Sequence, residues 1–163
     1  MDKTEKQLVD FAHGLAYADL PKAMVRATKA RVIDSMGCAM AALLSPPVRA
    51  LRRIAPTVVE RDGARLFGTL TRTTPDMAAL VNGTMVRYLD MSDAHLRLSS
   101  AHPSDNIPGL RAIAEISGAS GKDLLLAIAI SYEVQCTFCE IVPSHKKGWD
   151  QPLAPVISAM AMR

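Results

Sequence analysis

Apolar residues recur every three to four positions along most of this chain, which is the spacing of helices that bury one face. The longest such stretch runs from Pro21 towards the Pro46-Pro47 pair, and basic residues occupy its other face. Its expected buried stripe consists of Val25, Val32, Met36, Met40 and Leu43. The whole pattern predicts helices over residues 4–18, 21–44, 48–59 with an interruption near Pro56, 75–90, 105–117 and 122–142, and a further helical stretch from Pro152.

Residues 64–69 lack this period and are punctuated by Gly63 and Gly68, so we expect an extended segment there. A short strand would not change the class, and the sequence predicts an all-α, multi-helix, bundle-like domain. A length of 163 residues with 49% apolar residues is typical of one globular domain with its own core.

Charge and targeting signals add little to this picture. The net charge of +3 comes from scattered Lys and Arg, which argues against a nucleic-acid surface and is compatible with an acidic substrate. The first residues lack the apolar core of a secretory signal, and the longest strong apolar run, 124–130, is far short of the roughly 20 residues of a membrane span. We therefore expect no nucleic-acid partner, no membrane partner and a cytoplasmic location.

A polar loop separates two of the predicted helices and holds the most reactive side chains of the chain. It contains Asp90, Asp93, His95, Arg97 and His102. Pro103 favours an extended backbone at His102, and good helix caps follow at Ser104, Asp105 and Asn106. His102 should therefore lie beside a helix N-terminus, where free N–H groups favour a carboxylate. A His with nearby Asp is equipped to move a proton at neutral pH.

The residues alone leave two interpretations of this loop open, a solvated loop with capping residues and a catalytic loop. A related choice concerns Gly83, in the middle of the helix predicted before the loop. Gly costs about 1 kcal/mol there relative to Ala. Either another helix crosses closely over Gly83, or a ligand approaches it.

Cys136 and Cys139 form a C-x-x-C motif, which is a metal-like or redox-like spacing. A structural zinc site needs four ligands, and Cys38 and His145 would complete one only by chance of folding. We interpret the pair as buried free thiols and expect no metal.

Other catalytic motifs have no support in the sequence. It contains no Gly-rich phosphate loop, no GxSxG elbow and no HExxH motif. Ser99 and Ser100 are weak candidates for a nucleophile, because only their proximity to His102 favours them.

Four segments, in this order and at this spacing, resemble the MmgE/PrpD family: RLFGT (65–69), AALVNGT (78–84), LDMSDAH (89–95) and HPSDN (102–106). The similarity extends loosely from the first predicted helix to the KGWDQP segment (147–152), and HPSDN after an Asp-rich loop is its most specific part. The family includes 2-methylcitrate dehydratase and cis-aconitate decarboxylase.

The resemblance implies a lyase that acts on a small hydroxy-di- or tricarboxylate. In the dehydration of a 2-methylcitrate-like acid, a proton leaves the carbon next to a carboxylate and water is lost. The resemblance implies that Asp90 and His102 are catalytic, that no cofactor is needed and that the protein forms a homodimer. Expected substrate contacts are Asp93, His95, Ser104 and Asn106. A decarboxylase or an epimerase of the same family is an alternative.

Two positions depart from the family pattern: Ala94 stands where Thr is usual, and Ser92 stands where an acid or Asn is found. Family members are also much longer, with an α/β lid domain and basic active-site residues beyond the matched segment. We therefore expect residues 1–163 to form a single all-helical domain, an incomplete N-terminal fragment without the lid domain, which is inactive alone. The alternative is a non-catalytic helical oligomerisation or interaction module.

Overall fold

The computed structural model of this chain describes residues 3–58, 62–150 and 155. Its α-helices are α1 (Lys3–Gly14), α2 (Lys22–Ala41), α3 (Pro46–Ile54), α4 (Pro75–Arg87), α5 (Asn106–Ser117) and α6 (Gly121–Ile141). Short 3₁₀ turns are η1 (Tyr17–Asp19), η2 (Pro103–Asp105) and η3 (Ser144–Lys147). Strand β1 (Ala64–Arg65) pairs antiparallel with β2 (Arg72–Thr73), and β3 (His95–Leu96) with β4 (Ser100–Ala101). The predicted helical fold class is confirmed.

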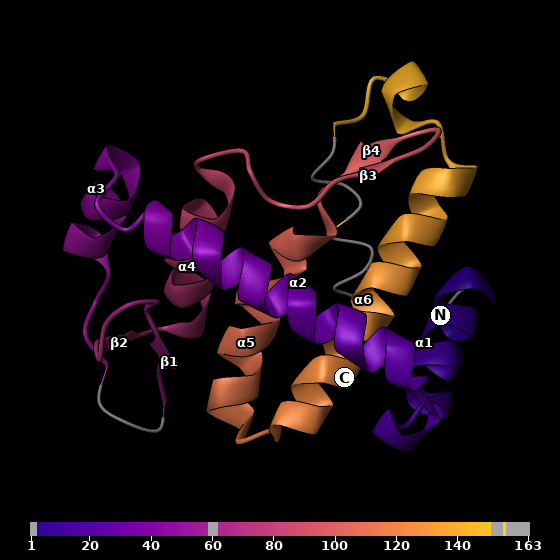
Figure 1. Cartoon of the computed structure of the whole chain (residues 1–163), viewed down its shortest axis with the longest axis horizontal. Helices are drawn as coiled ribbons and strands as arrows, with labels where there is room; N and C mark the ends of the chain where they lie inside the picture. Colours follow the sequence, from indigo (N-terminus) through magenta and orange to yellow (C-terminus); the bar gives the residue numbers. More distant parts are fainter. Residues whose placement is uncertain (1–2, 59–61, 151–154, 156–163) are drawn as a thin grey trace.

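The long helix α2 crosses α4 and α6, and the remaining elements are arranged around these three (Figure 1). Helices α5 and α6 are antiparallel neighbours joined by a short turn, in which Gly118 adopts a left-handed backbone with φ 67°. Helix α1 packs on α6, whereas α3 and the β1–β2 pair lie at the α4 end. The loop between α4 and α5 therefore emerges where α2, α4, α5 and α6 approach one another.

Small side chains allow α2 to lie close to its neighbours. The stripe predicted from periodicity is only half-buried, and its member Met40 is exposed. The fully buried residues of α2 are Thr28, Ser35, Cys38 and Ala39. Ala39 belongs to a core cluster that includes Phe67, Val81 and Met85, whereas Thr28 lies near Ile128 and Tyr132 of α6. Periodicity predicted that large apolar residues form the buried face of α2, but small residues lie there because the helix backbones approach closely.

Several helices end earlier than the apolar pattern predicted. Helix α1 ends at Gly14, and α3 ends at Ile54, before Pro56. Helix α4 ends at Arg87 because a turn follows, in which Asp90 has a left-handed backbone with φ 53°. Asp is among the few residues that adopt this conformation readily. The helix predicted from Pro152 lies outside the described residues, apart from Pro155.

The predicted extended segment is confirmed at β1, but its partner β2 and the β3–β4 pair were missed. Each strand is two residues long, which is too short to show the alternation that identifies a strand. The polar loop is therefore partly an ordered hairpin.

Asn82, rather than Gly83, makes the close contact of α4. A Cβ atom at Gly83 would meet no atom of the described residues within 4 Å outside the backbone of its own helix. Of the two alternatives, the close helix crossing is therefore excluded among the described residues, and approach of a ligand stays open. The buried Asn82 side chain accepts a hydrogen bond from the Phe67 backbone N–H (2.8 Å) and donates one to the Arg65 carbonyl (2.9 Å). It thereby satisfies two backbone groups of the segment 65–67.

Helix α6 is long and apolar enough to cross a membrane, with a mean hydropathy of 1.5, although the sequence analysis found no sufficient run. Core helices of globular domains meet the same criteria. Here α6 contacts α1, α2 and α5, and it buries Gln135 against Asn106. These are the contacts of a core helix.

Candidate functional site

The chain between α4 and α5 brings together most of the residues that the sequence analysis singled out. Its last turn, η2, packs against α2, α4, α5 and α6. The half-buried His102, which directly precedes η2, is therefore anchored to these helices. Pro103 at the first position of η2 keeps His102 extended, with φ −116° and ψ 91°, as predicted.

His102 is held by the backbone of the loop. Its Nδ1 lies 2.6 Å from the carbonyl oxygen of Asp93. Because a carbonyl can only accept, Nδ1 must carry the hydrogen, and we assign the tautomer from this contact. In the neutral ring Nε2 then has the free lone pair, so Nε2 is the atom that can accept a proton.

The Asp93 carboxylate is mostly buried, with 7% of the side chain exposed, and both oxygens are engaged. Oδ1 accepts from the Ser104 backbone N–H (3.0 Å), and Oδ2 accepts from the Tyr132 hydroxyl (2.8 Å). Arg31 Nε lies 3.9 Å from Oδ2. Asp93 thus occupies one of the N–H groups that were expected to hold a substrate carboxylate.

Arg87 links two further acids of the site. Its Nη1 donates to Asp90 Oδ1 (2.7 Å), and its Nε lies 3.6 Å from Asp105 Oδ1. The hydrogen bond and charge of Arg87 lower the pKa of the exposed Asp90, which is therefore anionic at neutral pH. Burial raises the pKa of Asp105 to about 6, although Arg87 and His102 oppose this. The charge of His102 makes a smaller contribution that lowers the pKa of both Asp90 and Asp105.

Two predicted substrate contacts are also engaged inside the protein. The buried Asn106 amide donates to the Pro103 carbonyl (3.0 Å) and to Gln135 Oε1. The Ser104 hydroxyl is buried and has no hydrogen-bond partner among the described residues, while its N–H serves Asp93. Their roles in substrate binding stay predictions.

His95 lies on β3 and approaches the end of α6, where its Nε2 is 3.6 Å from Glu140 Oε1. The β3–β4 pair thus brings His95 to a different neighbour from that of His102. A substrate contact of His95 stays a prediction.

Sequence reasoning missed the groups that support the loop. Tyr132 is 39 positions away from the Asp93 that it contacts, so no local pattern marks it. Arg87 lies three residues before Asp90, and this i,i+3 spacing was the available signal. Asp105 was identified only as a cap. Its place within HPSDN, directly after a proline turn that buries it, was the available signal.

The serines and cysteines belong to a separate region around the end of α6. The Ser99 hydroxyl bonds to the Val142 carbonyl and to Ser144, and the Ser100 hydroxyl lies 3.0 Å from His145 Nε2. These contacts give no support to a nucleophile activated by His102.

Cys136 is half-buried and Cys139 fully buried in α6. Burial and the neighbouring thiol raise the pKa of Cys136 to about 11, and burial raises the pKa of Cys139. Both thiols are therefore neutral at pH 7, as expected of apolar packing residues. Within residues 3–58, 62–150 and 155, no group of three or more His, Cys, Asp or Glu is placed to hold a metal ion.

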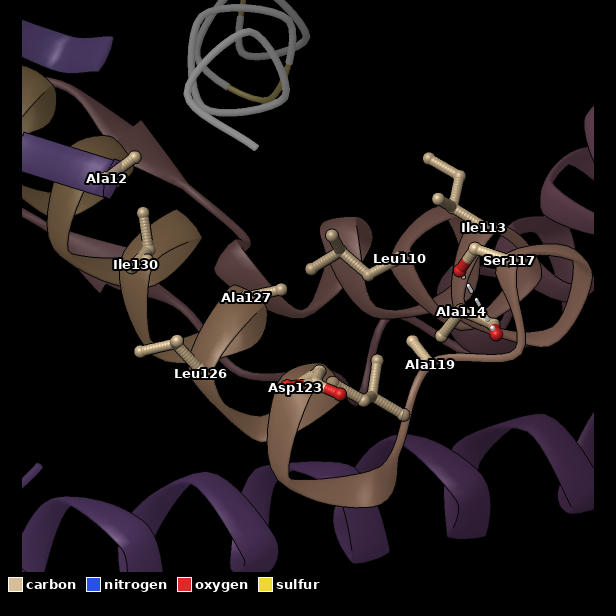
Figure 2. Close-up of a pocket in the computed structure, with 11 residues that line it drawn as sticks. Ala12, Leu110, Ile113, Ala114, Ser117, Ala119, Asp123, Leu126, Ala127 and Ile130 are labelled. Carbon is tan, nitrogen blue, oxygen red and sulfur yellow. Dashed lines mark hydrogen bonds between the residues drawn. The ribbon is translucent and has the colours of Figure 1, made fainter. Parts of the chain in front are cut away.

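Figure 2 shows an apolar groove between α5 and α6, with Ala12 of α1 at one end. Its volume is about 270 Å³, and its lining includes Leu110, Ile113 and Leu126. Asp123 is its charged side chain and is engaged with Ser120. An apolar wall with one carboxylate does not suit a di- or tricarboxylate. The polar loop, and not this groove, is the candidate site for such a substrate.

The buried Asp105 predicts a pH dependence of stability. Its pKa is about 6 in the folded chain and about 4 in an unfolded one. Between these pH values the folded chain binds more protons, so the free energy of unfolding falls as pH rises from about 4 to about 6. Asp105→Asn should remove this fall in the free energy of unfolding, which is on the order of 2 kcal/mol. Urea unfolding at pH 4 and pH 7 measures this. The variant should gain stability relative to wild type at the higher pH, and an equal difference at both pH values would contradict the burial argument.

The amino-acid sequence of the chain is similar to those of known proteins. The MmgE/PrpD N-terminal domain family matches residues 6–162. The 2-methylcitrate dehydratase of Escherichia coli (strain K12) is 31% identical over 142 residues, which are 80% of this chain and 29% of the relative. The 2-methylcitrate dehydratase-like protein oryR of Aspergillus oryzae is 31% identical and is matched by 99% of this chain, or 35% of the relative. A probable 2-methylcitrate dehydratase of Saccharomyces cerevisiae is 29% identical over 82% of this chain.

The chain thus spans about a third of the length of the relatives it matches. The matched family covers nearly all of the chain, including the whole loop with Asp90 and His102. Its helical architecture agrees with that of the family's N-terminal domain. The chain therefore belongs to the MmgE/PrpD family and corresponds to its N-terminal helical domain.

Proposed function

We propose that this chain supplies the proton-transfer loop of a hydro-lyase that dehydrates a small hydroxy-di- or tricarboxylate of the 2-methylcitrate type. The observation that carries the proposal is the contact between His102 Nδ1 and the Asp93 carbonyl, which leaves Nε2 as a proton acceptor. The names of the matched relatives, several of which are 2-methylcitrate dehydratases, support the substrate class.

In this mechanism Nε2 of His102 removes a proton from the carbon next to a substrate carboxylate. The electrons of the broken C–H bond form the new C=C bond, and hydroxide leaves from the neighbouring carbon. The imidazolium can return the proton to this hydroxide, so that water is the product. Asp90, held by Arg87, is the second catalytic group of this proposal and balances the positive charge that His102 carries while it holds the proton. No cofactor is needed in this scheme.

The substrate carboxylates need positive partners, which the loop offers only in part. Arg87 and Arg31 are already paired with Asp90 and Asp93. We propose that basic residues of the full product of the reading frame complete the site, in the part that corresponds to the unmatched length of the relatives. Residues 1–163 alone then do not catalyse turnover. Measurable dehydration by the purified 163-residue chain would contradict this point.

A non-catalytic interaction module is the second candidate function, and exposed apolar side chains favour it. Leu70 is 90% exposed, Leu44 75% and Ile33 72%. Such side chains are candidates for contacts with a second copy of the chain, which would form the expected homodimer. A decarboxylase or epimerase of the same family would use the same loop.

Ligand-dependent melting distinguishes the two functions in the full product of the reading frame that contains this chain. A ligand that binds only the folded state raises Tm. The lyase proposal predicts that 2-methylcitrate or citrate raises Tm, that His102→Asn removes the rise, and that His13→Asn on α1 retains it. A stable oligomer whose Tm is unaffected by these acids would favour the interaction module.

A further inference from the structure

Helix α6 carries a tyrosine whose hydroxyl reaches the loop from a distant part of the sequence. Tyr132 lies in the middle of α6, and its hydroxyl donates to Asp93 Oδ2 (2.8 Å). Burial and the charge of Asp93 raise the pKa of Tyr132, so its hydroxyl stays a hydrogen-bond donor throughout the physiological range. Nothing in the proposed proton transfer requires a tyrosine at this place, and the contact needs another explanation.

Asp93 connects this tyrosine to His102. Its Oδ1 accepts from the Ser104 backbone N–H (3.0 Å), and its own carbonyl accepts from His102 Nδ1 (2.6 Å). These two hydrogen bonds tie Asp93 to residues 102–104 at two points. The position of the Asp93 side chain therefore determines where its carbonyl lies, and the carbonyl determines which nitrogen of His102 carries the hydrogen.

Among the described residues, three groups hold the Asp93 carboxylate, and they differ in strength. Ser104 lies in η2 directly after His102, so its hydrogen bond joins Asp93 to the same short segment as His102 itself. Arg31 is 3.9 Å away with 53% of its side chain exposed, which makes its ion pair weak and screened by water. The Tyr132 hydroxyl is at full hydrogen-bond distance and belongs to a core helix. Tyr132 thus joins Asp93 directly to α6 through a side-chain hydrogen bond.

We propose that Tyr132 is a positioning residue for His102. By holding Asp93, it keeps the hydrogen on Nδ1 of His102 and leaves Nε2 free to accept a proton. Asp93 then acts through His102 and does not bind substrate, since both of its oxygens are engaged and a carboxylate repels a carboxylate. The role rests on the proposed function, in which His102 transfers the proton, but the tautomer can be measured without turnover.

The tautomer of His102 is visible in long-range ¹H–¹⁵N correlation spectra of the 163-residue chain. Above about pH 8 an ordinary histidine is neutral, and a free side chain prefers the hydrogen on Nε2. Wild-type His102 should instead show a protonated Nδ1. Tyr132→Phe, which removes only the hydroxyl, should move both ring nitrogens towards the signals of a free imidazole. Tyr17→Phe is the matched control, because Tyr17 lies beside Lys122 at the start of α6 and should leave His102 unchanged.

A second variant avoids the helical core. Asp93→Ala lies in the loop and removes the acceptor of both the Ser104 N–H and the Tyr132 hydroxyl, so the Nδ1 preference should weaken here too. Circular dichroism reports whether each variant keeps its helices. A wild-type His102 with its hydrogen on Nε2, or a His102 spectrum unchanged by Tyr132→Phe or by Asp93→Ala, would overturn the proposal. Because no activity is measured, failure of this proposal is distinguishable from failure of the proposed function.

Discussion

Replacement of His102 by asparagine should lower kcat for dehydration by about 10²–10⁴-fold, the usual contribution of a positioned acid or base. Asparagine retains a polar side chain that can still bond to the Asp93 carbonyl, but it cannot accept a proton from carbon. The loop should therefore keep its shape while the proton transfer fails.

The measurement is steady-state turnover of 2-methylcitrate by the full product of the reading frame, as wild type and as His102→Asn. His13→Asn is the matched control, because His13 is exposed in the last turn of α1 and far from the loop in sequence. His13→Asn should keep wild-type kcat. If His102→Asn retained more than about a tenth of wild-type kcat, His102 would not be the proton acceptor.

Asn82→Ala should lower the free energy of unfolding by about 2–4 kcal/mol, which is a large effect for one side chain. The change removes both hydrogen bonds to the segment 65–67 and leaves the Phe67 N–H and the Arg65 carbonyl unpaired next to the core. Asn82 itself is 2% exposed, so water cannot readily replace its amide.

Urea unfolding of the 163-residue chain tests this expectation. Thr84→Ala is a suitable control from the same helix, since the Thr84 hydroxyl bonds only to the Leu80 carbonyl among the contacts seen and is partly exposed. Thr84→Ala should lower the free energy of unfolding by less than about 1 kcal/mol. Equal losses in the two variants would show that Asn82 does not hold the 65–67 segment.

The helices could be predicted because their apolar period is long and their ends carry strong signals. Helix α4 begins after Thr74 with Pro75, where expected, and Gly118 ends α5 with a left-handed backbone. The two-residue strands could not be predicted, because pairing across a hairpin leaves no period in so short a segment. The sequence suggested that a helix or a ligand approaches α4 at Gly83. In the structure the close contact is made by the neighbouring Asn82, which bonds to the backbone of residues 65 and 67, and a Cβ atom at Gly83 would meet no such neighbour.

The loop residues could be identified by type, but not their partners. The structure pairs Asp90 with Arg87 and His102 with the Asp93 carbonyl, and the catalytic roles of Asp90 and His102 stay predictions. The engagement of Asp93 depends on Tyr132, which only the packing of α6 brings near. The burial that raises the pKa of Asp105 comes from four helices meeting at η2, and the place of Asp105 within HPSDN was its one local sequence signal.

We propose that this loop serves the loss of water from a hydroxy-tricarboxylate. An NMR spectrum of the products formed from ¹³C-labelled 2-methylcitrate by the full product of the reading frame tests this proposal. We expect an unsaturated tricarboxylate that retains every carbon of the substrate, and no such product with His102→Asn. Release of labelled CO₂, a change of configuration without loss of water, or unchanged substrate would contradict it.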